Sequence, residues 1–374
     1  MKMLLVQHKY SIPLSDPCIF PLGFMQISSQ LKMLGHNVKI LNYNLWKYDY
    51  SQELYNFKPD YVFFSGFEEF NELNIEYATM AKQLGIITVL GGAMATFGSD
   101  NMMPFFDIMV LGEGENVLNK ISESRGKIQG TKVDLDVLPL VDYNGFGVEE
   151  YHKRNGIKHM GVLTSRGCPW SCKFCAQTCH FQFRDLDNVF EEIDLYREKY
   201  KIDLLVFCDN TLNVSKNRFR RICKEMGIRR LPWSASIRLD RLDEEMVLDA
   251  KRGGCKYFVV GVESFKQKKL DLMNKNIRVD QICKSLDLLE KHKINYHGNV
   301  LMGLPGETAQ DILEECDSIP SGYNIFPVLV QPFIGTCFKN RSITAQEETL
   351  LSAMFSEDIK TRGMVQYPEL KKAA

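Results

Sequence analysis

The first third of the chain alternates short apolar runs with stretches in which apolar residues recur at helical spacing. The runs predict buried strands, and the helical spacing over 23–34 predicts a helix that ends at Gly35. Repeated strand–helix–strand order is typical of a parallel sheet with helices on both faces, so we expect a Rossmann-like doubly wound α/β domain. The expected strands span 2–7, 37–41, 61–65, 88–90 and 108–111.

A second strand–helix series begins at Gly161, and its six expected strands with interposed helices predict a partial (βα)6 barrel. Between the two series, residues 127–143 have no periodicity and contain Pro139, which indicates a linker. The predicted organisation is a first domain over 1–126, a linker over 127–155, the barrel over 156–340 and a short helical tail over 341–374. The expected strands span 161–164, 204–208, 233–236, 257–260, 296–302 and 324–329, and the expected helices include 188–200, 244–252 and 280–292.

Glycines follow three consecutive strands of the first series, at Gly66, at Gly91 and Gly92, and at Gly112. Open α/β sheets bind their ligands at the carboxyl ends of their strands. The pattern therefore favours a nucleotide-like ligand at this edge. The alternative is that the glycines only form tight turns.

Composition and charge narrow the classes of function. Of 374 residues, 45% are hydrophobic and 25% charged, as in soluble globular proteins, and the net charge of −1 gives no reason to expect a nucleic-acid partner. No uninterrupted apolar run approaches the roughly 20 residues of a membrane span, and the first residues lack the apolar core of a signal peptide. Eleven cysteines in such a chain predict reduced thiols and a cytoplasmic location.

Three cysteines, Cys168, Cys172 and Cys175, follow one another closely after the first strand of the second series. Thiolates at this spacing can wrap one face of an iron–sulfur cluster and leave one iron open for another ligand. Glycine and proline within the segment favour a loop over a helix. Zinc is the competing interpretation, with Cys179 and His180 available to complete a set of four ligands.

The pattern Cys-x-x-x-Cys-x-Phe-Cys after a first barrel strand resembles the signature of the radical S-adenosylmethionine (SAM) superfamily. The resemblance implies that the three cysteines hold a 4Fe–4S cluster whose open iron chelates SAM. It also implies reductive cleavage of SAM to a 5′-deoxyadenosyl radical that takes a hydrogen atom from substrate. Around SAM, it places Phe174 and the motif over 297–308, with Val300 and Met302, beside the adenine. Asp209 and Asn210 are expected at the amino group, and Arg238, which follows the strand that ends with Ser236, at the carboxylate. Glu263 is expected at the ribose or the aminoacyl part, and Ser236 is a further expected SAM contact.

The glycine turns of the first domain resemble the cobalamin-binding domain that is fused to many radical SAM enzymes. These turns comprise Pro21-Leu22-Gly23, residues 34–38, Gly91-Gly92 and residues 112–115. The resemblance implies a cofactor whose nucleotide tail is cradled at the strand ends. The implied cobalamin-binding residues are Tyr10, Ser65, Gly66, Gly91, Gly92, Gly112 and Glu113.

The sequence departs from one group of cobalamin proteins. It lacks the Asp-x-His-x-x-Gly motif, and Gln7-His8-Lys9-Tyr10 stands after the first strand instead. In addition, Met94 stands where many relatives carry a histidine. Radical SAM relatives often lack the motif histidine as well, so cobalamin is still expected. His8 and His36 are possible cobalt ligands, although His36 is better explained as a surface residue. A Rossmann-like domain that no longer binds corrin is the alternative.

With cobalamin bound, the expected reaction is methyl transfer from SAM to an unactivated carbon of a small-molecule or peptide substrate. The family further implies a flavodoxin or ferredoxin as electron donor. Alternatives within the enzyme class are a cobalamin-dependent ring rearrangement or oxidation, and a SAM-radical oxidoreductase without cobalamin. A cobalamin or cluster sensor without turnover is the alternative outside it. Methylthio transfer to tRNA is not expected, because neither the extra cysteines of a second cluster nor an RNA-binding module is visible in the sequence.

Overall fold

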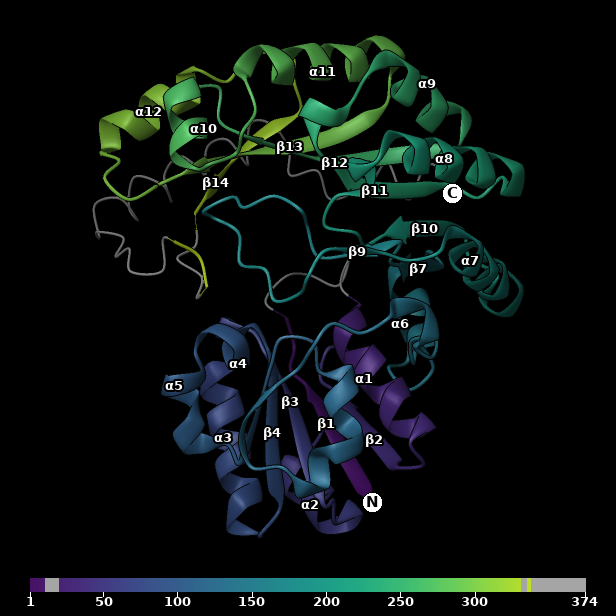
Figure 1. Ribbon diagram of the computed structural model, residues 1–374, viewed down its shortest axis with the longest axis vertical. Coiled ribbons are helices and arrows are strands. Elements are labelled where there is room, and N and C mark those ends of the chain that lie inside the picture. Colours follow the sequence, from purple (N-terminus) through teal and green to yellow (C-terminus); the bar gives the residue numbers. More distant parts are fainter. Residues whose placement is uncertain (11–19, 331–334, 338–374) are drawn as a thin grey trace. The chain divides into compact units, whose positions relative to one another are not determined.

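The computed structural model describes residues 1–10, 20–330 and 335–337, so the expected helical tail lies outside the described residues. The chain divides into two compact units (Figure 1). The first comprises Met1–Gly156 and Ala176–Arg184, and the second comprises Ile157–Cys175 and Asp185–Ala374. Among the described residues, no helix is both long and apolar enough to cross a membrane.

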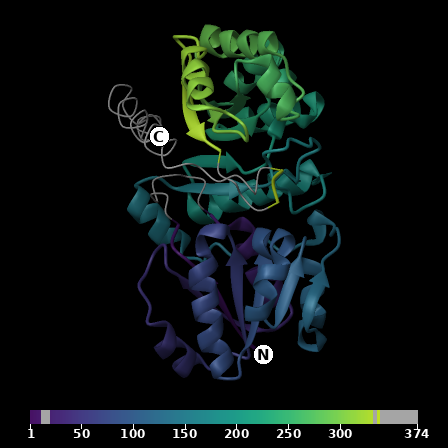
Figure 2. The same ribbon diagram turned by 90° about the vertical axis from the view of Figure 1, so that its left-hand side faces the viewer.

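The first unit is built on a six-stranded sheet in the order β2-β1-β3-β4-β5-β6, and every pairing is parallel. Figure 1 shows α1 on one side of this sheet and α3 and α4 on the other, and Figure 2 shows its strands running alongside one another. The expected Rossmann-like doubly wound sheet is confirmed. Its strands are β1 (Lys2–Gln7), β2 (Asn37–Asn42), β3 (Tyr61–Gly66), β4 (Ile87–Gly92), β5 (Ile108–Leu111) and β6 (Gly126–Gln129).

The last strand, β6, lies at the start of the segment that was predicted to be a linker. It pairs with β5 from Ile108↔Gly126 to Leu111↔Gln129. Its alternation of half-buried and exposed residues is too short and too polar to stand out as a strand in the sequence. The helices of this unit are α1 (Leu22–Met33), α2 (Tyr50–Phe57), α3 (Asn71–Gln83), α4 (Ala93–Phe97), α5 (Ser99–Met102) and α6 (Val148–Asn155), with 3-10 turns η1 (Glu68–Phe70), η2 (Met103–Phe105), η3 (Glu115–Glu123) and η4 (Leu135–Val137).

The second unit carries another parallel six-stranded sheet, in the order β14-β13-β12-β11-β10-β7. This open sheet with helices between successive strands is the expected partial (βα)6 barrel, and each expected strand is present. The first strand begins two residues earlier than expected, because buried His159 and Met160 pair with Leu204 and Leu205. The strands are β7 (His159–Val162), β10 (Leu204–Phe207), β11 (Trp233–Ile237), β12 (Cys255–Glu263), β13 (Asn295–Met302) and β14 (Ile325–Leu329), and two short strands elsewhere are β8 (Ser165–Arg166) and β9 (Gln182–Phe183).

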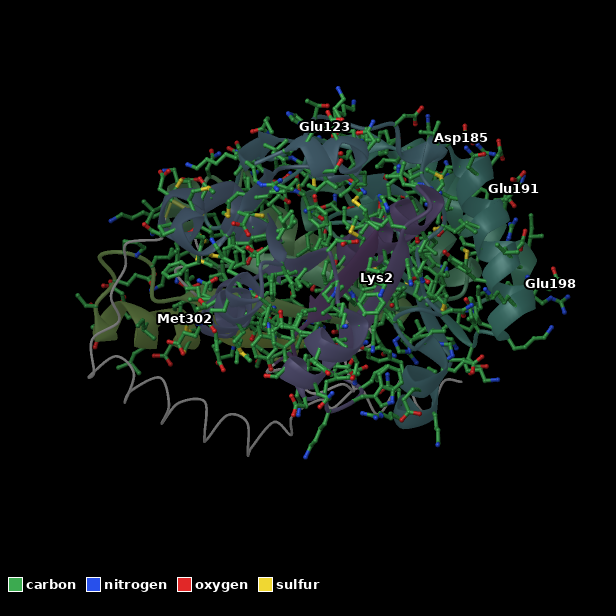
Figure 3. All side chains as sticks on the ribbon, turned by 90° about the horizontal axis from the view of Figure 1, so that it is seen from below. Lys2, Glu123, Asp185, Glu191, Glu198 and Met302 are labelled. Atoms are coloured by element: carbon green, nitrogen blue, oxygen red, sulfur yellow. The ribbon has the colours of Figure 1, made fainter. Side chains whose placement is uncertain are left out.

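Helix α7 shows how local sequence forms these elements. Asp185 caps its first turn by accepting hydrogen bonds from two backbone N–H groups, and its apolar face is buried. Glu191 and Glu198, two turns apart, project from the opposite face (Figure 3). The helices of the second unit are α7 (Leu186–Tyr200), α8 (Lys216–Arg229), α9 (Glu244–Arg252), α10 (Gln267–Leu272), α11 (Val279–His292) and α12 (Ala309–Asp317), with 3-10 turns η5 (Leu212–Val214) and η6 (Leu239–Arg241).

The tight packing of β13 gives a prediction for stability. A Cβ atom at Gly298 would lie 2.7 Å from Ile325 Cδ1 and 2.8 Å from Val262 Cγ2. We expect Gly298→Ala to lower the free energy of unfolding by about 1–3 kcal/mol in urea denaturation, because the neighbouring valine and isoleucine side chains must shift from their packed positions. Gly23→Ala is the control, since no heavy atom lies within 4 Å of that Cβ and alanine favours the helix. An equal loss in both variants would contradict this account.

Candidate functional site

The three cysteines lie in one loop that follows β7 and β8 in the second unit. Gly167 begins the loop with a φ of 73°, a left-handed conformation that favours glycine. The Cys175 N–H donates to the Cys172 carbonyl at 3.1 Å, so the last two cysteines share a tight turn. Cys168 and Cys172 are half-buried, whereas Cys175 is an exposed residue.

Strand ends supply polar neighbours to two of the thiols. The hydroxyl of Thr211, a buried residue after β10, lies 3.9 Å from Cys168 Sγ. After β11, Arg238 Nη1 donates to Cys172 Sγ at 3.9 Å. Hydrogen bonds to cluster sulfur ligands orient them and change the reduction potential of a bound cluster.

Arg238 is buried, and its other N–H groups donate hydrogen bonds to protein groups. Its Nη2 donates to the Lys275 carbonyl at 2.8 Å, its Nε donates to Asp240 at 2.9 Å, and its guanidinium lies 4.3 Å from the centre of the Trp170 ring. Trp170 belongs to the cysteine loop. Arg238 thus holds the cysteine loop through its contacts with Cys172 and Trp170. Its expected contact with the SAM carboxylate stays a prediction.

Glu263 ends β12 at an irregularity in the sheet. The register with β13 shifts between Gly261 and Glu263, and Glu263 has a φ of 65°. Such bulges re-aim side chains. Here the Glu263 carboxylate accepts a hydrogen bond from Lys275 Nζ at 2.7 Å, and both side chains are buried. A Cβ at Gly261 would lie 2.5 Å from that Nζ, so glycine leaves the space that the ion pair occupies.

Lys275 also faces the cysteine loop. Its Nζ lies 5.6 Å from the centre of the Phe174 ring. Burial of the thiol raises the pKa of Cys175, negative charge on Cys168 and Cys172 raises it further, and the Lys275 charge acts in the opposite direction. Each of the three thiols therefore has a polar or charged neighbour from a different part of the unit.

The segment 273–276, which follows α10, anchors the loop through its backbone. Lys173 N–H donates to the Met273 carbonyl at 3.0 Å, and Asn274 Nδ2 donates to the Ser171 carbonyl at 2.8 Å. Asn274 adopts a left-handed φ of 53°. The sequence predicts no role for this segment, including Lys275, because Met-Asn-Lys-Asn carries no periodicity and no motif.

Asp209 lies two residues past the end of β10, and both oxygens of its carboxylate accept hydrogen bonds from protein groups. It accepts hydrogen bonds from Thr164 N–H at 2.9 Å, from the Thr164 hydroxyl at 2.8 Å and from the Ser165 hydroxyl. Burial raises the pKa of Asp209, and these hydrogen bonds counteract the rise. The structure therefore ties the end of β10 to the residues that lead into the cysteine loop, and Asn210 beside it is exposed.

The other residues expected near SAM lie on the central strands. Ser236 is half-buried on β11 and pairs with Val259. Val300 and Met302 are buried on β13, where Val300 is in register with Glu263 and with Pro327 of the edge strand β14. The structure thus brings Phe174, Arg238 and Glu263 together through Lys275. Among the described residues, no hydrogen bond joins Ser236 or Met302 to that group.

In the first unit, the strand-end glycines face one another. Ser65 is in register with Gly91, and Gly66 with Gly92. A Cβ at Gly66 would lie 2.6 Å from the Gly91 carbonyl oxygen, whereas the Cβ position of Gly91 is open. This edge is bare backbone, which suits the close approach of a ligand such as a nucleotide tail.

Gly112 and Glu113 follow β5 at the same sheet. Gly112 has a φ of 72°, and its N–H donates to the Thr96 hydroxyl at 3.0 Å. Glu113 is buried, and its carboxylate accepts a hydrogen bond from the His180 N–H at 3.4 Å. His180 and Cys179 therefore belong to the first unit, whereas the cysteines that they were to complete in a zinc site belong to the second.

His8 and Tyr10 follow β1. His8 is buried among aromatic rings, including Phe70 and Tyr77, and its Nε2 lies 2.9 Å from Asn74 Oδ1. These contacts explain His8 as a core histidine and leave no support for it as a cobalt ligand. The Tyr10 N–H donates to Asn44 at 2.9 Å, and burial raises the pKa of the Tyr10 hydroxyl. His36 is half-exposed just past α1, as expected.

The residues present fit both implied cofactors. Three thiols on one loop, with neighbouring donors and a buried ammonium, are a donor set suited to an iron–sulfur cluster. Within the described ranges, no three histidine, cysteine, aspartate or glutamate side chains converge to hold a single metal ion. At the end of β4, the open Cβ position of Gly91 and the exposed Gly92 leave backbone accessible to a nucleotide-containing cofactor, while Gly66 allows β3 and β4 to pack closely beside them.

Comparison with known families identifies these sites. A model of the radical SAM superfamily matches residues 162–319, which include the cysteine loop. The chain belongs to the radical SAM superfamily. A model of the B12 binding domain matches residues 15–122, which include the strand-end glycines. The protein is therefore a radical SAM enzyme whose cofactors are a 4Fe–4S cluster, SAM and cobalamin.

Individual relatives agree with this assignment. An uncharacterized methyltransferase of Pyrococcus horikoshii is 26% identical over 78% of this chain and 71% of its own length. The anaerobic magnesium-protoporphyrin IX monomethyl ester cyclase of Cereibacter sphaeroides is also 26% identical, over 61% of this chain and only 43% of its own length. The radical SAM methyltransferase TsrM from Kitasatospora setae shares the fold, with a TM-score of 0.71 at 19% identity over 90% of this chain and 74% of that chain.

The environment of His8 predicts a pH-dependent stability of the first unit. Burial lowers the pKa of His8 from 6.5 to about 4. The unfolded chain therefore binds a proton between these values while the folded chain does not, and stability present above pH 6.5 is lost as the pH falls toward 4. We expect this to amount to about 3 kcal/mol.

The measurement is urea unfolding between pH 7.5 and pH 4.5 of the wild type and of His8→Gln. The variant should lose less stability than the wild type over this range, because glutamine does not titrate. His36→Gln is the comparison at a half-exposed site, where partial burial also lowers the pKa of the histidine, so its pH profile should differ from that of the wild type less than the profile of His8→Gln does. Identical pH profiles for wild type and His8→Gln would refute the assignment.

Proposed function

We propose that the protein is a cobalamin-dependent methyltransferase that uses SAM to methylate an unactivated carbon of a small molecule. The observation that carries the proposal is the presence of a B12 binding domain and a radical SAM region in one chain. The methyltransferase relatives support the choice of reaction.

When bound, the cluster supplies the electron that cleaves SAM, and cobalamin supplies a carrier for the methyl group. The protein holds these groups. Cys168, Cys172 and Cys175 are the proposed cluster ligands, and Arg238 and Lys275 keep their loop in place.

The SAM-binding roles follow the placement of residues at the strand ends. Phe174 presents a ring at the end of the loop, and the bulge in β12 directs Glu263 toward the same side as Lys275. Asn210, Ser236, Val300 and Met302 are proposed further contacts, and Asp209 is proposed to act through Thr164 and Ser165. In the first unit, the proposed cobalamin contacts are Tyr10, Ser65, Gly66, Gly91, Gly92, Gly112 and Glu113.

Radical SAM chemistry needs an external electron, and a flavodoxin or ferredoxin is the proposed donor. A second candidate reaction is ring formation or oxidation without net methylation, which the cyclase relative favours. The two reactions differ in what becomes of SAM. Methyl transfer leaves S-adenosylhomocysteine, whereas hydrogen abstraction alone leaves 5′-deoxyadenosine and methionine.

The proposal predicts the metal content and the products of the loaded protein. After anaerobic reconstitution with iron, sulfide and hydroxocobalamin, we expect about four iron atoms and about one cobalt per chain. With reductant, SAM and substrate, the protein should form both S-adenosylhomocysteine and 5′-deoxyadenosine, measured by liquid chromatography and mass spectrometry.

Variants separate the two parts of the site. Cys172→Ala should lose the iron and both nucleoside products but keep cobalt, because cobalamin binds to the other unit. Formation of 5′-deoxyadenosine without S-adenosylhomocysteine would favour the oxidation or ring-forming alternative. Bound cofactors with neither product would favour a sensor, and zinc in place of iron would overturn the proposal.

A further inference from the structure

Lys275 is a buried charged residue that the expected chemistry of the family does not use. Its ammonium contacts the Glu263 carboxylate at 2.7 Å and lies 5.6 Å from the centre of the Phe174 ring. Burying an ammonium is costly unless a counter-charge compensates it. A second buried lysine, Lys269, is paired in the same way with Glu307 at 2.7 Å.

The backbone around Lys275 is attached to the cysteine loop at several points. Its own carbonyl accepts a hydrogen bond from Arg238, which also contacts Cys172 Sγ. The preceding residue, Asn274, donates to the Ser171 carbonyl at 2.8 Å. These bonds fix the backbone at Lys275 to the loop, and the ion pair with Glu263 holds its ammonium near Phe174.

The position of the ammonium gives the sign of the effect. Lys275 Nζ lies 5.6 Å from the centre of the ring of Phe174, the residue before Cys175, and the Glu263 carboxylate lies 2.7 Å from that Nζ. The ion pair therefore contacts the cysteine loop through its positive end. A cluster gains one negative charge on reduction, and a nearby fixed positive charge stabilises that reduced form.

We propose that Lys275 is a positioning residue that fixes the cysteine loop and raises the reduction potential of the bound cluster, with Glu263 as the counter-charge that limits the effect. This proposal rests on the proposed function only in that the loop holds a cluster. It concerns the potential before SAM binds and is independent of whether the reaction is methylation.

The test is a redox titration of the reconstituted full-length protein without SAM, followed by electron paramagnetic resonance of the reduced cluster. In Lys275→Met, the ratio of reduced to oxidised cluster at a fixed potential should fall about tenfold, or ~59 mV for a one-electron couple. In Glu263→Gln the ratio should rise, because the lysine charge is then no longer offset. A general disturbance of the site would move both variants in one direction.

Two further variants complete the design. Lys275→Arg keeps the charge, so its potential should stay near that of the wild type. Lys269→Met breaks an ion pair of similar burial in helix α10, where the carboxylate partners are Glu307 and Glu315, and it should leave the potential unchanged.

The outcomes separate this inference from the proposed function. Unchanged potentials in both Lys275→Met and Glu263→Gln, or shifts in the same direction, would overturn the inference while the function stands. If Lys275→Met does not retain the cluster but Lys275→Arg does, the positioning role is supported, and Glu263→Gln against wild type decides the charge effect. If the wild type takes up no iron–sulfur cluster, the proposed function fails first.

Discussion

The buried ion pair between Lys275 and Glu263 is the constraint on which the second unit's site depends. Two charges taken out of water gain little net stability, but removing one partner of such a pair typically costs about 3–5 kcal/mol. The pair is therefore better explained by what it positions than by what it stabilises. It joins the end of β12 to the segment that anchors the cysteine loop, and Gly261 leaves the space that it needs.

Helix α10, which precedes this segment, contacts the loop that follows a third strand, β13. The helix begins four residues after the end of β12 and carries Lys269, which is buried against Glu307 in the loop after β13. Glu307 in turn accepts a hydrogen bond from the Leu304 N–H at 2.8 Å. The helix thus contacts the loop after β13 through Lys269, whereas the turn that follows it contacts the cysteine loop and the end of β12. Three loops that are far apart in sequence are held in one arrangement before any ligand binds, which is what preorganised binding requires.

The sequence predicts the strands and the cysteine loop well, because both depend on local patterns. Apolar runs locate every strand of the second sheet, and the spacing of Cys168, Cys172 and Cys175 predicts a loop that binds an iron–sulfur cluster. Lys275 was missed because its role depends on contacts 12 residues away with Glu263 and in space with Phe174. Likewise, no local pattern reveals that Arg238 donates to Cys172, 66 residues earlier. The polar strand β6 was missed because its only cue is its partner β5.

The two sheets show how one architecture serves two kinds of ligand. At the first, buried Gly66 pairs with Gly92 across the strand ends, and Gly91 and Gly92 leave backbone without side chains where a ligand with a nucleotide tail can approach. At the second, buried charges and hydrogen-bond donors surround the thiols, because a cluster needs a fixed set of ligands and a defined electrostatic environment more than it needs room. The fold supplies the parallel strand ends in both units, and the residues placed on them decide the chemistry.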